Sequence, residues 1–159
     1  MDAVKKDELC CPKFDPAPWD EKEIVWNNKL FIKDSVLAFF HIPLNLKGKV
    51  IKNTGLMQKH MAMPDQFLML MDERMFSADV YFAVTKEVPE ATTIKMSGTF
   101  LSKVFEGPYK DAPKWMKAMN AYVASKGKQA QKIFSYYTTC PKCAKAYGKN
   151  YVVLLAKVE

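Results

Sequence analysis

Carboxylates and tyrosines are the residues of this sequence best suited to chemistry on a small molecule. Asp72, Glu73 and Glu106 each end an apolar segment, where solvated charges are also common. A carboxylate of raised pKa can deprotonate water while a tyrosine hydroxyl protonates the leaving oxygen. The same carboxylate could instead neutralise a cationic ligand, since an unpaired buried charge is costly. We therefore expect either acid-base hydrolysis or binding of a cation.

Methionines and aromatic residues are unusually frequent, with ten methionines and twenty aromatic residues in 159. Flexible thioethers and flat rings suit a pocket that accepts ligands of different shapes. A stripe of such residues at helical spacing also forms ordinary core, and a lone histidine such as His60 is commonly packed or at the surface. The candidate ligand-binding residues are Met57, His60, Met61, Phe67, Asp72, Tyr81, Phe82, Tyr109, Trp115, Met119, Tyr122, Tyr136 and Tyr137.

The cysteines offer one possible metal site. Cys140 and Cys143 have the spacing of half a zinc site, which Cys10 and Cys11 could complete if the N-terminal arm folds back. A reactive or redox thiol pair and an inert loop are the alternatives. Structural zinc is thus the one candidate metal, and no cofactor is required by the rest of the sequence.

Charge and hydropathy limit the classes of partner. The net charge is +7, but Arg74 is the single arginine among 24 basic residues, and dispersed lysines usually coat a solvated surface. Apolar runs are shorter than the roughly 20 residues needed to cross a bilayer, and no signal peptide is recognisable. We expect a cytoplasmic monomer that binds lipophilic small molecules, with no direct nucleic-acid or membrane partner.

The periodicity of the chain predicts an α+β fold made of two similar halves. In each half a strand, a helix and two strands follow one another, a β-α-β-β unit repeated at an offset of roughly sixty residues. A unit with one helix cannot cover both faces of its sheet, so the copies should pair about a pseudo-two-fold axis and leave a cleft. The predicted strands are residues 30–42, 67–71, 80–85, 92–105, 133–138 and 151–156, and the predicted helices are residues 49–63 and the segment between Asp111 and Gly127.

The sequence Phe105-Glu106-Gly107-Pro108-Tyr109, which closes a strand and precedes a Trp-containing helix, resembles a passage of GyrI-like domains. The resemblance covers about residues 30–158 and implies a stand-alone member with duplicated SHS2-type modules. It places a first module at 30–90 and a second at 91–159 of a single domain, after an N-terminal arm over 1–29. We expect the arm, with Trp19 and Trp26, to dock either over the cleft or on another face.

The GyrI-like resemblance implies an aromatic-lined cleft that binds lipophilic, cationic or planar aromatic molecules, in a multidrug-binding or sequestration role. Members that hydrolyse cyclopropane-bearing DNA-alkylating compounds make a hydrolase the alternative, and gyrase inhibition is a second alternative. Glu106 adjoins the family-like motif, so we assign the catalytic roles to Glu106 and Tyr136. Many members carry an acidic residue before a tyrosine where this sequence reads Phe134-Ser135-Tyr136-Tyr137, so the usual carboxylate partner of a cation is missing or has moved.

Overall fold

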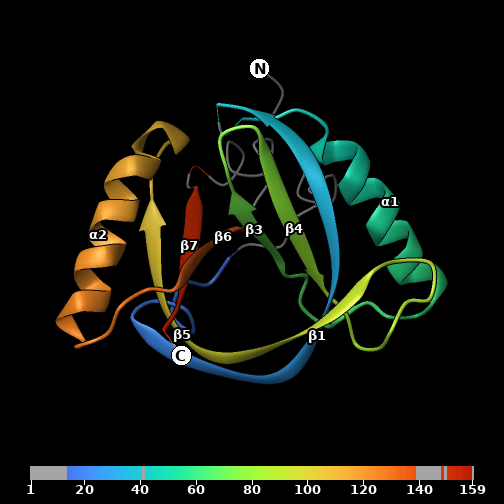
Figure 1. The fold of residues 1–159 in the computed structure, drawn as a ribbon, viewed down its shortest axis with the longest axis horizontal. Helices are drawn as coiled ribbons and strands as arrows, with labels where there is room; N and C mark the ends of the chain where they lie inside the picture. The colour runs from blue at the N-terminus through green and yellow to red at the C-terminus, as the bar shows by residue number, and fades with distance from the viewer. Residues whose placement is uncertain (1–13, 41, 139–147, 149, 159) are drawn as a thin grey trace. The chain divides into compact units, whose positions relative to one another are not determined.

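The protein has an α+β fold of antiparallel strands and two helices (Figure 1). The computed structural model describes residues 14–40, 42–138, 148 and 150–158. The chain forms two compact units, unit 1 from residues 1–24 with 99–159 and unit 2 from residues 25–98. The elements are β1 (Lys22–Phe39), β2 (Ile42–Pro43), α1 (Leu46–Lys59), β3 (Met69–Glu73), β4 (Ser77–Ala83), β5 (Thr93–Glu106), a short 3-10 turn (Tyr109–Asp111), α2 (Ala112–Ser125), β6 (Lys132–Tyr137) and β7 (Tyr151–Lys157).

In unit 2, α1 packs on an antiparallel sheet whose strand order is β2-β1-β4-β3. Asn53 and Met57 of α1 are buried. The helix ends earlier than the predicted residue 63 because Met61 adopts a left-handed conformation, with φ of +52°. Met61 is therefore 80% exposed and does not continue the buried stripe of the helix.

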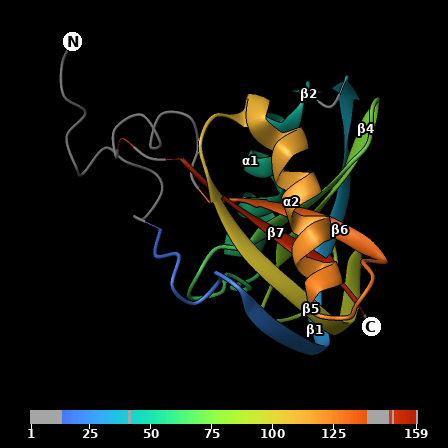
Figure 2. The same cartoon turned by 90° about the vertical axis from the view of Figure 1, so that its left-hand side faces the viewer.

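In unit 1, α2 packs on an antiparallel sheet in the order β6-β7-β5 (Figure 2). The helix follows Asp111, as predicted, although the Asp111 side chain makes no capping hydrogen bond. Gly127, with φ of +70°, turns the chain just after the helix. The predicted apolar stripe is confirmed as core, in a cluster formed by Leu101, Trp115, Met119, Tyr122, Val123, Val152, Leu154, Ala156 and Val158.

Apart from the two-residue strand β2, which pairs with β1, the two units have the same order of strands and helix and the same pairing. The strand before the helix and the strand after it each pair with the last strand, β4 in unit 2 and β7 in unit 1. Each predicted strand overlaps an observed one, with three differences in bounds. The strand predicted at 30–42 begins at Lys22 and ends at Phe39, and Ile42 belongs to the separate β2. The strands predicted at 67–71 and 80–85 lie at Met69–Glu73 and Ser77–Ala83. No described helix has both the length and the apolar character that a membrane span requires.

Candidate active site

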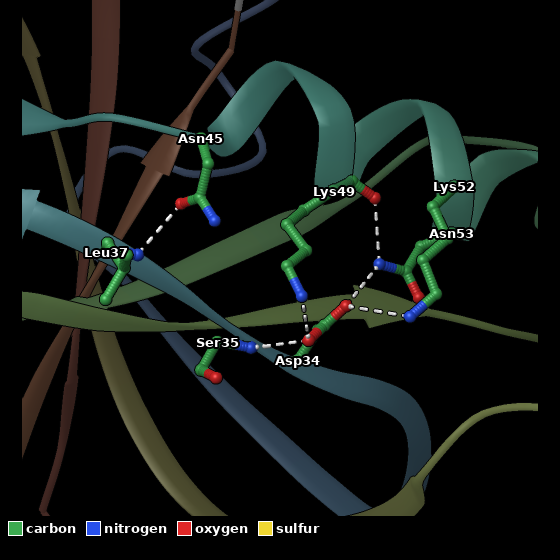
Figure 3. A network of polar contacts seen from close by, with 7 residues as sticks. All are labelled: Asp34, Ser35, Leu37, Asn45, Lys49, Lys52 and Asn53. Atoms are coloured by element: carbon green, nitrogen blue, oxygen red, sulfur yellow. Dashed lines mark hydrogen bonds and ion pairs between the residues drawn. The ribbon is translucent and has the colours of Figure 1, made fainter.

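The strand register of unit 2 separates its side chains onto two faces, because successive residues of a strand point to opposite sides. On the face that meets α1, Asp34 of β1 accepts hydrogen bonds from Lys49 Nζ at 3.2 Å and from Asn53 Nδ2 at 3.0 Å (Figure 3). Asn53 is 1% exposed, so this contact fixes the helix on the sheet. The neighbours of Asp34 in β1, Lys33 and Ser35, consequently lie on the opposite face.

Two carboxylates lie directly opposite one another on this helix-free face. Asp72 of β3 pairs in register with Asp79 of β4, and Tyr81 follows Asp79 on the same side. The Asp72 and Asp79 side chains are only 16% and 18% exposed. Like charges in directly opposed positions destabilise a sheet, so a compensating cation is needed.

Arg74, the only arginine of the sequence, supplies that cation. Its Nη1 lies 3.3 Å from Asp72 Oδ2, while Nη1 and Nη2 lie 3.3 and 3.2 Å from the two Asp79 oxygens. Its Nε donates to Ser77 Oγ at 3.1 Å. The hydrogen bond to Asp79 and the nearby negative charges raise the pKa of the Arg74 guanidinium, which stays protonated. With two carboxylates and one cation, this Asp72–Arg74–Asp79 cluster carries one net negative charge.

Tyr81 brings a phenol to the same face. It is 4% exposed, its ring meets Phe31 edge-on at 6.4 Å, and Lys33 Nζ lies 5.9 Å from the ring centre. Tyr81 also interacts electrostatically with Arg74, which places the phenol near the cluster. Carboxylate, guanidinium and phenol are together a set of groups that can move a proton and stabilise a developing oxyanion.

An exposed apolar strip continues from this site along β1. Leu37 pairs in register with Ser77, on the same side as Asp79, and Phe39 follows on that side. The Phe39 and Phe40 rings are 4.5 Å apart, and Phe40 is 5.8 Å from Phe76. Leu37, Phe39, Phe40 and Phe76 are all more than half exposed. The site therefore adjoins a surface that suits a lipophilic molecule.

The predicted ligand-binding residues of unit 2 are only partly brought together. Asp72 and Tyr81 share the site, whereas Met57 and Phe82 are completely buried on the α1 side. His60 Nε2 lies 3.0 Å from Glu90 Oε1, Met61 is exposed, and Phe67 packs against Phe82. Arg74, Asp79 and Lys33 were absent from the prediction. A lone arginine close to two aspartates in a lysine-rich chain was the signal for the first two.

In unit 1, the predicted catalytic pair shares the face opposite α2. Glu106 pairs in register with Tyr151, and Tyr136 pairs with Val153, the residue two positions further along β7. Phe14 and Trp19 of the N-terminal arm lie 6.1 and 5.5 Å from the Tyr136 ring. This part of the arm is therefore docked on Tyr136, and Glu106 is exposed.

The other predicted residues of unit 1 lie elsewhere. Trp115, Met119 and Tyr122 are in the core cluster beneath α2, with Tyr137 packed against it. The side chain of Tyr109 is outside the description. All four cysteines, Cys10, Cys11, Cys140 and Cys143, also lie outside the described residues. Within the described ranges, histidine, cysteine, aspartate and glutamate side chains form no group of three able to hold a metal.

Fold and site together define an α+β protein with a carboxylate–arginine–tyrosine site on the sheet face opposite α1. The family model Bact_hydrolase, described as "Bacterial hydrolase", matches residues 1–158, so the chain belongs to this family. No curated protein matches the sequence.

Two solved structures, both from Listeria innocua, resemble the fold. One, titled a hydrolase, is 15% identical with a TM-score of 0.62. The other, titled an uncharacterized conserved protein, is 9% identical with a TM-score of 0.64. In both cases the match covers 88% of this chain and 92% of the other. At such identities the likeness concerns the fold alone.

Proposed function

We propose that this protein is a hydrolase whose active site is the Asp72–Arg74–Asp79 cluster together with Tyr81. The observation that carries the proposal is the direct opposition of Asp72 and Asp79 around the only arginine of the chain, beside a buried phenol. Opposed carboxylates are unfavourable for the sheet, which suggests that they serve the chemistry. Membership of a family described as bacterial hydrolases supports the same class of reaction.

Asp72 is the general base in the proposed mechanism. Arg74 contacts Asp72 through one nitrogen and Asp79 through two. Asp72 takes a proton from water, and the water oxygen attacks the substrate. Tyr81 donates its phenolic proton to the oxygen that gains electrons, and Arg74 stabilises the negative charge there. Asp79 orients the guanidinium for that role.

The proposed substrates are lipophilic molecules, since Leu37, Phe39, Phe40 and Phe76 extend the site as an exposed apolar strip. A cyclopropane conjugated with a carbonyl, as in DNA-alkylating compounds, suits these groups. The water oxygen bonds to a cyclopropane carbon, and the strained carbon–carbon bond breaks. Its electron pair moves to the carbonyl oxygen, which takes the Tyr81 proton, so the product is the substrate plus one water.

Incubation of the purified protein with a cyclopropane-bearing alkylator tests this proposal. Mass spectrometry would detect the substrate plus the mass of one water, and ultraviolet absorbance would follow the loss of the conjugated carbonyl. Asp72→Asn and Tyr81→Phe should each slow the reaction by about 10²–10⁴-fold, the usual contribution of general acid-base catalysis.

Asp65→Asn is the control, because Asp65 is an exposed carboxylate outside the site. Its rate should equal that of the unmodified protein. Equal rates for Asp72→Asn and the control would show that Asp72 is not the general base. The absence of a hydrated product with the unmodified protein would exclude this substrate class.

Binding without turnover is a second candidate, favoured by the aromatic side chains of unit 1. Phe14 and Trp19 both contact the Tyr136 ring, and Phe14 also contacts the Tyr151 ring. The distances between ring centres are 5.5 to 6.1 Å. Such rings suit planar lipophilic cations, which gain about 0.5–2 kcal/mol from cation–π contact. Titration with a fluorescent aromatic cation should then give saturable quenching that Trp19→Phe changes, and a non-saturable signal would reject this function.

The common order and pairing of the two units also support the proposal that they are copies of one module, as in GyrI-like domains. An experimental structure provides the test. Residues 25–98 should then superpose on residues 99–158 strand for strand, and a mismatch in strand pairing would reject the duplication.

A further inference from the structure

Unit 1 contains a pocket that the proposed active site does not use. The pocket has a volume of about 250 Å³, and it is named here the Tyr122 pocket. Its lining combines two carboxylates, two lysines and apolar groups: Glu21, Glu23, Thr99, Leu101, Tyr122, Lys126, Lys128 and Val158. A single water needs about 10–15 Å³ of cavity volume, so the pocket has room for a small organic molecule.

Hydrogen bonds hold the turn that carries Glu21 beside this pocket. The Trp19 carbonyl accepts a hydrogen bond from the buried Ser102 Oγ at 2.5 Å, and Asp20 Oδ1 accepts one from the Val104 N–H at 3.1 Å. Glu21 itself has φ of +52°, a conformation that costs free energy for a residue with a side chain. Strained residues held by several contacts are characteristic of binding sites.

Tyr122 presents a phenol to the pocket from α2. It is 9% exposed. Lys103 Nζ and Lys126 Nζ lie 5.3 and 5.7 Å from the ring centre. Burial, followed by the charges of Glu21 and Asp20, raises the pKa of the Tyr122 hydroxyl. The hydroxyl is therefore a donor at neutral pH.

The pocket is lined by side chains of both charges. Lys103 Nζ lies 3.3 Å from Glu21 Oε1, but neither Glu23 nor Lys126 forms an ion pair within the described ranges. A ligand with an ammonium and a carboxylate group would have a partner for each charge, and its carboxylate could accept a hydrogen bond from the Tyr122 hydroxyl. Leu101 and Val158 would contact an apolar side chain.

We propose that the Tyr122 pocket binds a small zwitterion of the α-amino acid class, with Glu23 receiving the ammonium group and Lys126 the carboxylate. Tyr122 donates its hydroxyl hydrogen to the same carboxylate. The inference goes beyond the proposed hydrolysis and does not depend on it, because the pocket is lined by residues of unit 1 and the catalytic groups belong to unit 2.

Ligand-observed NMR on the full chain tests the proposal with three related probes. L-leucine carries both charges, N-acetyl-L-leucine only the negative charge, and L-leucine methyl ester only the positive charge. L-leucine should bind, and each single-charge probe should bind about tenfold more weakly, the loss expected for one charged contact. Tyr122→Phe should weaken L-leucine binding without unfolding the protein, which circular dichroism would verify.

Two charge variants test which residue binds the ammonium group and which binds the carboxylate of the ligand. In Glu23→Gln, L-leucine and the N-acetyl probe should bind equally, and in Lys126→Gln, L-leucine and the methyl ester should bind equally. Lys117→Gln, at an exposed position of α2, is the control and should retain the preference for the zwitterion. The proposal is overturned if none of the probes binds, if all three bind equally, or if the control loses the preference.

Discussion

Arg74 and Asp79 form a two-point ion pair, with Nη1 3.3 Å from Oδ2 and Nη2 3.2 Å from Oδ1. The planar guanidinium matches both carboxylate oxygens while Nε still reaches Ser77. A lysine ammonium is a point charge and cannot reproduce this geometry. The orientation of the positive charge beside Tyr81 thus depends on arginine.

Arg74→Lys should therefore reduce kcat for the hydrolytic reaction by about 10²–10³-fold, as the loss of one preorganised donor does. Urea unfolding should change little, because the Arg74 side chain is about half exposed. Steady-state kinetics and urea denaturation of the same preparation separate the two effects. Full activity in this variant would show that the ion pair only closes the β3–β4 turn.

The docking of α1 on its sheet should weaken at low pH, because it depends on the negative charge of Asp34. Burial raises the pKa of Asp34, but hydrogen bonds from Asn53, the Ser35 N–H and Lys49 together outweigh it, so the pKa lies below its ordinary value of 3.8. The stabilisation is complete above this value, and it is lost as the pH falls through the folded-state pKa.

Asp34→Asn should cost about 1–3 kcal/mol of unfolding free energy at neutral pH. The difference from the unmodified protein should shrink as the pH falls below the ordinary value of 3.8 and Asp34 is protonated in the folded state. Urea unfolding at several pH values checks this, with Asp65→Asn as the exposed counterpart. A difference that is constant with pH would contradict the role of the Asp34 charge.

Two glycines should respond in opposite directions to substitution by alanine. Gly107 has φ of +143°, and a Cβ there would lie 3.5 Å from Asp111 Oδ2 and 3.6 Å from Trp115 Cζ2. Gly48 is inside α1, and a Cβ there would meet nothing within 4 Å. Gly107→Ala should destabilise by about 1–3 kcal/mol through backbone strain, while Gly48→Ala should stabilise by about 0.5–1 kcal/mol. Thermal unfolding of both variants measures the signs, and equal shifts would refute the argument.

The cysteine prediction can be tested by metal analysis. If Cys140, Cys143, Cys10 and Cys11 bind structural zinc, protein purified without chelators should contain about one zinc per chain by elemental mass spectrometry. Cys140→Ser should lower this content and the thermal stability together. A chain that contains no zinc, even after incubation with excess zinc, would leave the reactive-thiol and inert-loop alternatives.

The order of helices and strands could be predicted because the spacing of the apolar residues in each segment corresponds to the face that the segment buries. Trp115, Met119, Tyr122 and Val123 recur at helical spacing, and they do bury one face of α2. The end of α1 could not be predicted, since nothing in the composition around Met61 reveals its left-handed conformation. The same periodicity that predicted α2 also made Trp115 and Met119 candidates for ligand binding, whereas packing places both in the core.

Only part of the candidate site was within reach of sequence reasoning. Asp72 and Tyr81 were singled out by residue type, but the opposition of Asp72 to Asp79 depends on the register of β3 against β4. A shift of one residue would send Asp79 to the α1 face. Periodicity does not determine register, so the pairing of the carboxylates around Arg74 could not be derived from it.

Unit 1 is assembled from both ends of the chain, residues 1–24 and 99–159, whereas unit 2 is one continuous stretch. Synthesis on the ribosome proceeds from the N-terminus, so residues 25–98 emerge before the rest of unit 1 exists. The Tyr122 pocket, which Glu21 and Glu23 line, is therefore complete only after β5 and α2 have been synthesised. A nascent chain that stops after Gly98 would possess every proposed catalytic group and still lack that pocket.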